Sequence, residues 1–279
     1  MKFETPGCGR IARLALGACF ILFFGWISVG LTGCATKTDG ANSPQADLVT
    51  ESDEPEARKR ARIRLELAVG YFEQGQTNVA LDELKQSLAT DPNYADAYNL
   101  RGLIYMRLGD LRLAEESFRR ALAISPRDPG IMHNYGWMLC QQARYPESQQ
   151  ALAQAIASPV YAGRAKSWMA QGLCQVRAGL KTEGELSLQR SYELDPGNPI
   201  AGYNLANLLY QRGEFGRAQF YVRRLNNSEA ANAESLWLGI KVERRMENRD
   251  AMQQLAGQLR KRFAQSREMA AYERSAFDE

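Results

Sequence analysis

The hydrophobic pattern divides the chain of 279 residues into three stretches. Lys2, Arg10 and Arg13 give the chain a basic start, and residues 11–31 are almost continuously apolar. Residues 35–56 are rich in Ser, Thr, Asp, Gly and Pro and contain few large apolar side chains. From residue 57 onward, small, apolar and aromatic residues recur with a regular spacing that is typical of packed helices. We therefore expect an all-α domain that is preceded by a leader and a linker.

The first stretch has the layout of a secretory signal peptide, because a basic start and an apolar centre are followed by small residues. The sequence LTGC at residues 31–34 resembles the bacterial lipobox. That resemblance implies that residues 1–33 are removed, and that Cys34 becomes the first mature residue with a covalent diacylglycerol and an N-acyl chain. A transmembrane anchor is the alternative, since the apolar run is close to the roughly 20 residues that span a bilayer.

The residues after the lipobox bear on location. An aspartate directly after the cysteine signals retention in the inner membrane in lipobox proteins, and this chain has Ala35 there. The resemblance therefore implies the periplasmic face of the outer membrane. Residues 34–56 form the lipidated N-terminus and a flexible tether in this interpretation, because so polar a segment cannot bury enough surface to offset its ordering entropy.

The five cysteines of the chain reduce to two in the folded domain. Cys8 and Cys19 lie in the predicted leader and Cys34 is the predicted lipid site, which leaves Cys140 and Cys174. A disulfide is permitted in a periplasm. Apolar-flanked cysteines on separate helices are more often buried thiols, and free thiols are our expectation for this pair.

Charge and motifs give no sign of catalysis. The formal charge is +3 for the whole chain and +1 without residues 1–33, which hold three basic residues and one acidic residue. That balance gives no global attraction to nucleic acid. The single histidine, His133, has no partner at metal-ligand spacing, and the chain has no phosphate loop or nucleophile elbow. We expect a protein that is not an enzyme, with no metal, small-molecule substrate or nucleic-acid partner and no cofactor beyond the acyl chains on Cys34.

Residues 98–126 carry the tetratricopeptide spacing of aromatic, small and proline residues. The signature positions are Tyr98, Gly102, Tyr105, Gly109, Ala114, Phe118, Ala121 and Pro126. Copies of the pattern lie 34 residues upstream, at 64–92, and 34 residues downstream, at 132–159. A further copy follows a two-residue shift at 168–196, and a weaker one occupies 204–225.

Two more segments, 237–246 and 251–263, have the outline of a sixth helical pair. The second of them is basic, and we expect it to cap the domain, although a basic amphipathic helix can also lie on a membrane surface. One helical pair cannot bury its apolar face, so neighbouring pairs must stack. The resemblance to tetratricopeptide proteins implies a right-handed solenoid of about five to six repeats over residues 57–279.

A tetratricopeptide solenoid has a concave groove, which the second, fifth, ninth, twelfth and thirteenth positions of each first helix line in that family. Transferring these positions gives the candidate partner-binding residues Leu65, Val69, Phe72, Asn99, Leu103, Met106, Trp137, Met169, Leu173, Val176, Tyr203, Asn207 and Tyr210. The same positions add Arg107, His133, Cys140 and Arg177. A contiguous apolar surface of this kind usually marks a protein interaction site.

Two interpretations of these residues remain open. The three leucines of the set either line the groove or pack against their own second helices. Trp137, Tyr203 and Tyr210 favour the groove, because the packing aromatics of the repeat occupy other positions. The groove positions include no clustered basic set, which disfavours capture of a chain's terminal carboxylate and favours an amphipathic helix or strand as the ligand.

Three segments carry a more specific resemblance. They are the lipobox with its polar tether, NYGWMLCQQ at residues 134–142, and RKRFAQSRE at residues 260–268. Together they resemble the type IV pilus biogenesis and stability lipoproteins of the PilW/PilF family. The resemblance implies a pilotin, which binds secretin subunits and promotes their outer-membrane localisation and assembly. The repeats and lipobox alone fit equally well a general periplasmic scaffold lipoprotein for cell-wall or outer-membrane assembly machinery.

Overall fold

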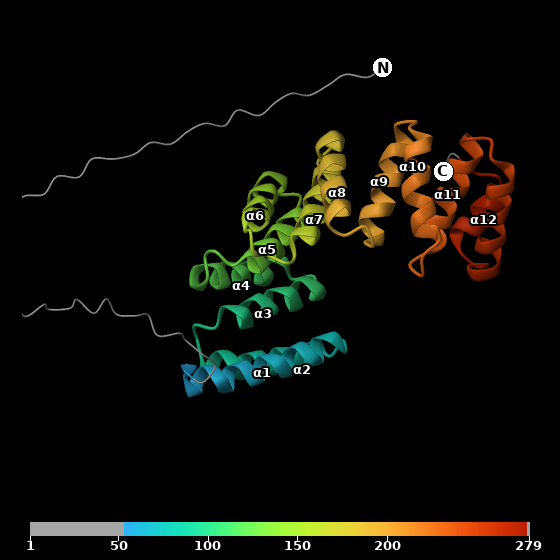
Figure 1. Ribbon diagram of the computed structural model, residues 1–279. Helices are drawn as coiled ribbons and strands as arrows, with labels where there is room; N and C mark the ends of the chain where they lie inside the picture. The colour runs from blue at the N-terminus through green and yellow to red at the C-terminus, as the bar shows by residue number, and fades with distance from the viewer. Residues whose placement is uncertain (1–52, 278–279) are drawn as a thin grey trace, which may run out of the picture. The chain divides into compact units, whose positions relative to one another are not determined.

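The computed structural model describes residues 53–277, in which all regular secondary structure is helical (Figure 1). The predicted signal peptide, the lipid site at Cys34 and most of the predicted tether lie outside the described residues. The helices are α1 (Glu56–Glu73), α2 (Thr77–Thr90), α3 (Ala95–Leu108), α4 (Leu111–Ile124), α5 (Pro129–Gln141), α6 (Tyr145–Ala157), α7 (Arg164–Arg177), α8 (Lys181–Leu194), α9 (Pro199–Gln211), α10 (Phe215–Asn226), α11 (Ala233–Arg245), α12 (Arg249–Arg262) and α13 (Arg267–Glu273).

The helices pack as six successive pairs, α1 with α2 through α11 with α12 (Figure 1). We call the odd-numbered members, α1 to α11, the first helices. Each first helix also contacts the next first helix, and within residues 53–277 no helix contacts another that is more than two places away along the chain. This nearest-neighbour packing confirms the all-α repeat solenoid, with six helical pairs and a short final helix, α13, against α11 and α12.

The two helices of a pair approach closely because one of them carries a glycine at the crossing. A Cβ atom added to Gly102 would lie 2.6 Å from the ring of Phe118, and one added to Gly172 would lie 2.7 Å from Leu188 Cγ. Gly136 is equally tight, with Leu152 Cγ at 2.8 Å. The eighth position of the repeat is therefore small for a steric reason.

The turn between the helices of a pair repeats the same backbone conformation. Gly75, Gly109, Gly179 and Gly213 have φ between 79° and 84°, the left-handed region that glycine enters without steric cost. Two non-glycine residues adopt it in the remaining pairs, Ala143 in the third and Glu247 in the sixth, both with φ of 57°. The turn conformation therefore marks the repeat register even in the two pairs that lack the glycine of the signature.

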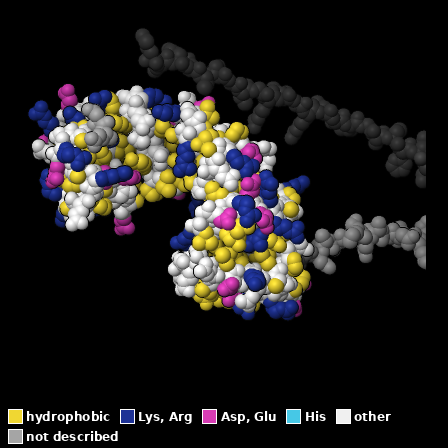
Figure 2. Space-filling model, turned by 180° about the vertical axis from the view of Figure 1, so that it is seen from behind, with side chains coloured by type: hydrophobic (Ala, Val, Ile, Leu, Met, Phe, Trp, Pro, Cys, Tyr) yellow, Lys and Arg dark blue, Asp and Glu magenta, His cyan; other side chains and the backbone are white. Residues whose placement is uncertain are grey.

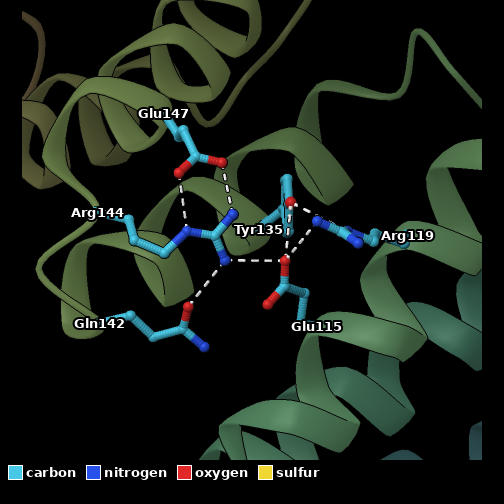
Figure 3. A network of polar contacts seen from close by, with 6 residues as sticks. All are labelled: Glu115, Arg119, Tyr135, Gln142, Arg144 and Glu147. Carbon is cyan, nitrogen blue, oxygen red and sulfur yellow. Dashed lines mark hydrogen bonds and ion pairs between the residues drawn. The ribbon is translucent and has the colours of Figure 1, made fainter.

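Polar networks join one repeat to the next. Figure 3 shows the network between the second and third pairs, in which Arg144 Nη1 lies 2.9 Å from Glu115 Oε1. Arg119 shares the same carboxylate oxygen at 2.8 Å, and Glu147 binds the other side of Arg144 at 2.5 Å. Deeper in the stack, the buried carboxylate of Glu243 accepts hydrogen bonds from Arg223, Gln219 and Asn248. Without such partners a buried carboxylate would strongly destabilise the folded state, because its charge has been removed from water.

Cys140 on α5 and Cys174 on α7 form a disulfide. The expectation of two free thiols was therefore wrong. Its premise was that cysteines on separate helices have no partner, but α5 and α7 are neighbouring first helices whose Cα atoms at these residues are 5.8 Å apart. That separation lies within the range that a disulfide spans. The two cysteines are 34 residues apart, one repeat period, so stacking places them side by side.

The close helix crossing gives a stability prediction. Gly102→Ala should destabilise the domain by about 1–3 kcal/mol, because the new methyl overlaps the buried Phe118 ring. The measurement is urea denaturation followed by circular dichroism.

The control is Gly257→Ala on the exposed face of α12, where an added Cβ meets nothing within 4 Å. Alanine is the better helix former by about 0.5–1 kcal/mol, so the control should raise the midpoint. Equal effects of the two substitutions would contradict the steric explanation.

Candidate protein-binding groove

The first helices bring the predicted groove positions onto one continuous surface, since each of them contacts the next from α1 to α11. Most of the predicted residues are half-buried, as expected of side chains that pack at their base and expose an edge. This half-buried group is Phe72, Asn99, Leu103, Met106, His133, Trp137, Met169, Leu173, Val176, Tyr203, Asn207 and Tyr210. Val69, Arg107 and Arg177 are exposed.

Two predicted groove residues belong to the core instead. Leu65 is 9% exposed and packs in the cluster that α1 forms with α2 and α3, and Cys140 is 2% exposed within the disulfide. Leu103 and Leu173 pack at their bases against neighbouring core clusters while remaining half-buried. Of the three leucines, Leu65 therefore offers the least surface to a partner.

Arginines cover aromatic rings along the groove. Arg107 Nη1 donates to the backbone oxygen of Phe72 at 3.0 Å, and its guanidinium lies 5.2 Å from the Phe72 ring centroid. Arg177 repeats this arrangement at Trp137, 5.0 Å from the ring centroid, with Nη1 3.8 Å from Cys140 Sγ. The stacked arginines add cation–π attraction to both rings. The Trp137 ring packs at its base against the core cluster that contains Cys140 and Cys174. A ligand that binds at Trp137 would therefore contact this ring and the long side chain of Arg177 that lies over it.

His133 takes part in a structural hydrogen bond. Its Nδ1 lies 2.9 Å from Ser167 Oγ, which joins α5 to α7. Burial lowers the pKa of this imidazole, and the nearby positive charge of Lys166 lowers it further. No cluster of three or more His, Cys, Asp or Glu side chains that could hold a metal ion occurs in residues 53–277.

The groove continues beyond the predicted residues into a pocket between α9, α11 and α13. This C-terminal pocket has a volume of about 380 Å³, and its lining includes Tyr203 and Asn207 from α9. Glu234, Trp237 and Lys241 line it from α11, and Arg267, Glu268 and Arg274 from the chain around α13. Burial raises the pKa of Tyr203, with Glu234 adding to the shift, so its phenol stays protonated near neutral pH.

The α11 residues of this pocket are functional candidates that sequence reasoning missed. The sixth helical pair carries little of the repeat signature, so no groove positions could be transferred to it. The left-handed turn at Glu247 supplies the register that the signature lacks. Counted from that turn, Glu234, Trp237 and Lys241 occupy the second, fifth and ninth positions of the sixth repeat. The sequence Asn-Arg-Asp after Glu247 occurs in turns of many kinds, so it does not by itself indicate the repeat register of the sixth pair.

Figure 2 shows one face of the molecule, on which apolar side chains form patches that are bordered by Lys, Arg, Asp and Glu. Within residues 53–277, none of the helices has the length and apolar character that a membrane span requires. The half-buried apolar residues of the groove form a strip that is suited to binding another polypeptide.

The stacked helical pairs and their groove define a tetratricopeptide-repeat protein, and the tetratricopeptide repeat family model matches residues 65–129 and 139–199. Such proteins are typically binding scaffolds. The chain is also 30% identical over 247 residues to the type IV pilus assembly protein PilF of Pseudomonas aeruginosa, a match that covers 88% of this chain and 95% of that one. The chain therefore belongs to the PilF family.

Solved structures agree with that membership. The structure from the functional characterisation of Pseudomonas aeruginosa PilF matches with a TM-score of 0.72 and 27% identity, covering 79% of this chain and 100% of the other. The crystal structure of PilW, described as a widely conserved type IV pilus biogenesis factor, matches with a TM-score of 0.69 and 30% identity, covering 76% and 97%. These similarities support a role of the repeat domain in type IV pilus biogenesis, with protein partners.

The environment of His133 predicts a pH dependence. Because its pKa is lowered in the folded state, protonation favours unfolding. Its contribution to stability is complete above the unfolded pKa near 6.5 and is lost as the pH falls from there through the lowered pKa of the folded state, by at most about 1.4 kcal/mol per pH unit. The chain has one histidine, so its NMR titration is unambiguous. We expect a midpoint below 6.5.

Lys166→Gln is the matched test of the electrostatic part of this shift. Removing the exposed charge should move the midpoint of His133 part of the way back toward 6.5 while burial holds the rest. A wild-type midpoint at or above 6.5 would show that the imidazole is not buried as described.

Proposed function

We propose that this protein is a lipid-anchored pilotin, which binds secretin subunits in the groove of its first helices and promotes their outer-membrane localisation and assembly in type IV pilus biogenesis. The observation that carries the proposal is the match to PilF, which spans nearly the whole of both chains. The half-buried apolar surface from Phe72 on α1 to Tyr210 on α9 supports it, because it provides a binding strip of the right chemistry.

In this proposal the groove shields an apolar segment of the secretin subunit from water. A secretin subunit that has not yet assembled exposes apolar surface that its neighbours later bury, and such surface aggregates in water. Leu103, Trp137 and Leu173 present half-buried apolar side chains to a segment of that kind. Binding protects the segment until the ring forms, after which the subunit interface competes for the same surface.

The lipid on Cys34 determines the membrane localisation of the protein in this proposal. A diacylglycerol and an N-acyl chain on one residue give more than the two hydrophobic signals that stable anchoring requires. A polar segment of the composition found at residues 35–56 then leaves the repeat domain free to meet subunits near the membrane. Because the secretin subunit is bound to the anchored protein, it reaches the outer membrane together with that protein.

The groove should be separable from the rest of the surface by substitution. We expect the immobilised full chain in mild detergent to capture the secretin from solubilised outer-membrane proteins, identified by mass spectrometry. A Trp137→Ala, Tyr210→Ala double variant removes two large ring surfaces from the groove and should lose about tenfold or more in recovery, since aromatic residues dominate interface energetics.

Phe220→Ala is the matched control, because Phe220 is the exposed aromatic of α10 with 59% of its surface accessible and does not lie on a first helix. It should capture the secretin as well as the wild type does, and circular dichroism should show all three proteins equally folded. Capture of cell-wall or membrane-insertion proteins without a secretin would overturn the pilotin proposal and favour a general scaffold.

The anchor has its own test. In cells fed an alkyne fatty acid, the wild type should incorporate the label and sediment with outer membranes. Cys34→Ala should lose the label and leave the outer-membrane fraction, because the acylated residue is gone. Cys19→Ala, within the apolar run, is the control and should behave as the wild type. Retention of the label in Cys34→Ala would place the lipid elsewhere and refute the lipobox prediction.

A further inference from the structure

The first helix of the stack carries an apolar face that the described residues leave half exposed. Ile63 and Leu67 on α1 are 53% and 44% exposed, and they lie one helical turn apart on the same side of the helix. Gly70 continues the row, and a Cβ atom added there would meet nothing within 4 Å. We call Ile63, Leu67 and Gly70 the outer face of α1, because no helix of residues 53–277 precedes α1 in the stack.

Ile63 stands at a repeat position that is fully buried in every later pair. The residue twelve places before the left-handed turn is at most 1% exposed in those pairs, where it is Ala97, Ile131, Ser167, Ala201 or Ser235. Ala97 and Ile131 are covered by core clusters that include helices of the preceding pair. The outer face of α1 is therefore a stacking surface on which no helical pair of residues 53–277 packs.

The outer face lies on the opposite side of α1 from the groove. Ile63 and Phe72 are nine residues apart, which is two and a half turns of a helix with 3.6 residues per turn. A surface that covers Ile63 and Leu67 therefore leaves Phe72 and the rest of the groove accessible to a protein partner.

The charged side chains beside the outer face suit the headgroup layer of a membrane. Lys59 Nζ lies 3.1 Å from Glu56 Oε1 in a pair at the start of α1. Arg60 is exposed three residues before Ile63 and has no acidic partner within residues 53–277. A helix of this kind can keep its charged groups among lipid phosphates while its apolar side chains enter the boundary of the acyl chains.

The predicted lipid anchor holds this face near a phospholipid surface. Only the polar residues 35–55 separate Cys34 from the start of α1. A flexible chain of about 20 residues has a root-mean-square end-to-end distance of about 25 Å. Two half-exposed aliphatic side chains bind a membrane weakly by themselves, but the anchor makes their binding intramolecular and so raises its effective concentration.

From these observations we propose that the outer face of α1 docks on the phospholipid surface that holds the lipid of Cys34, with Ile63 and Leu67 at the acyl boundary and Arg60 among the phosphates. The proposal rests on the lipid anchor of the proposed function. It goes beyond that function because docking gives the repeat domain a preferred orientation, in which the groove side of α1 faces away from the lipid.

The test uses the acylated mature chain in vesicles of phosphatidylethanolamine and phosphatidylglycerol, with a fluorescent label on a cysteine introduced by Gly70→Cys. This site leaves Ile63 and Leu67 intact, and Gly257→Cys on α12 is the matched control site, because an added Cβ meets nothing within 4 Å at either glycine. The native cysteines do not react, since two form the disulfide and Cys34 is acylated in the proposed function. Phospholipid with a spin label on its acyl chain should quench the label at position 70 and leave the label at position 257 unchanged.

Ile63→Ser together with Leu67→Ser should abolish the quenching at position 70. Leu186→Ser on α8 is the matched control, because Leu186 is 61% exposed on a helix far along the chain from the anchor and should not affect the quenching. Equal quenching at the two label sites, or quenching that survives the double substitution, would overturn the docking while the chain still floats with the vesicles. A chain that does not float with the vesicles would instead refute the anchor, and the docking with it.

Two further outcomes would assign the outer face to another occupant and overturn the proposal. Energy transfer between chains that carry donor and acceptor labels at position 70 would indicate a second copy of the chain. Protection of the label from aqueous iodide without quenching by the spin-labelled lipid would indicate that the chain's own residues 35–52 cover the face.

Discussion

Each helical pair of this protein has an apolar face that only the next pair can cover, and the rest of the structure follows from that constraint. Ile104 on α3 is completely buried in the cluster that α1, α2 and α3 build together, and Leu238 on α11 is buried against α9 and α10. No pair supplies a complete core by itself. The chain must therefore continue as a stack, and within residues 53–277 the short helix α13 packs against the last pair in place of a further pair.

The groove is a consequence of that stacking. Gly102, Gly136 and Gly172 let the two helices of each pair approach closely. The stacking of successive pairs then brings the first helices side by side, with their outward positions in a row. Contacts between repeats then stiffen the row, from the Arg107 contact with Phe72 at one end to the disulfide between α5 and α7 in the middle. A stiff groove loses less conformational entropy when a segment binds, so the bracing contributes to affinity without touching the ligand.

The sequence predicted the fold and much of the groove wherever the repeat signature was strong. Between Gly75 and Gly213 the small residues and left-handed glycines set the register, so the repeat spacing alone places residues such as Trp137 and Tyr203 on a first helix. Prediction failed where a neighbour in space decided the outcome. The disulfide of Cys140 was missed because helix adjacency was not applied to the cysteines, and Lys241 was missed because a conformation at Glu247, rather than a residue type, carries the register there.

The ninth position of the repeat shows how one constraint gives two kinds of surface. From α1 to α11 it holds Val69, Leu103, Trp137, Leu173, Asn207 and Lys241. Four apolar residues are followed by an amide and an ammonium group, although all six positions stand at the same place relative to the left-handed turn of their pair. An apolar strip alone binds a segment in either direction and in several registers, since hydrophobic contact is not directional. An amide and an ammonium group at one end reduce that ambiguity, because covering polar groups with an apolar segment costs their desolvation.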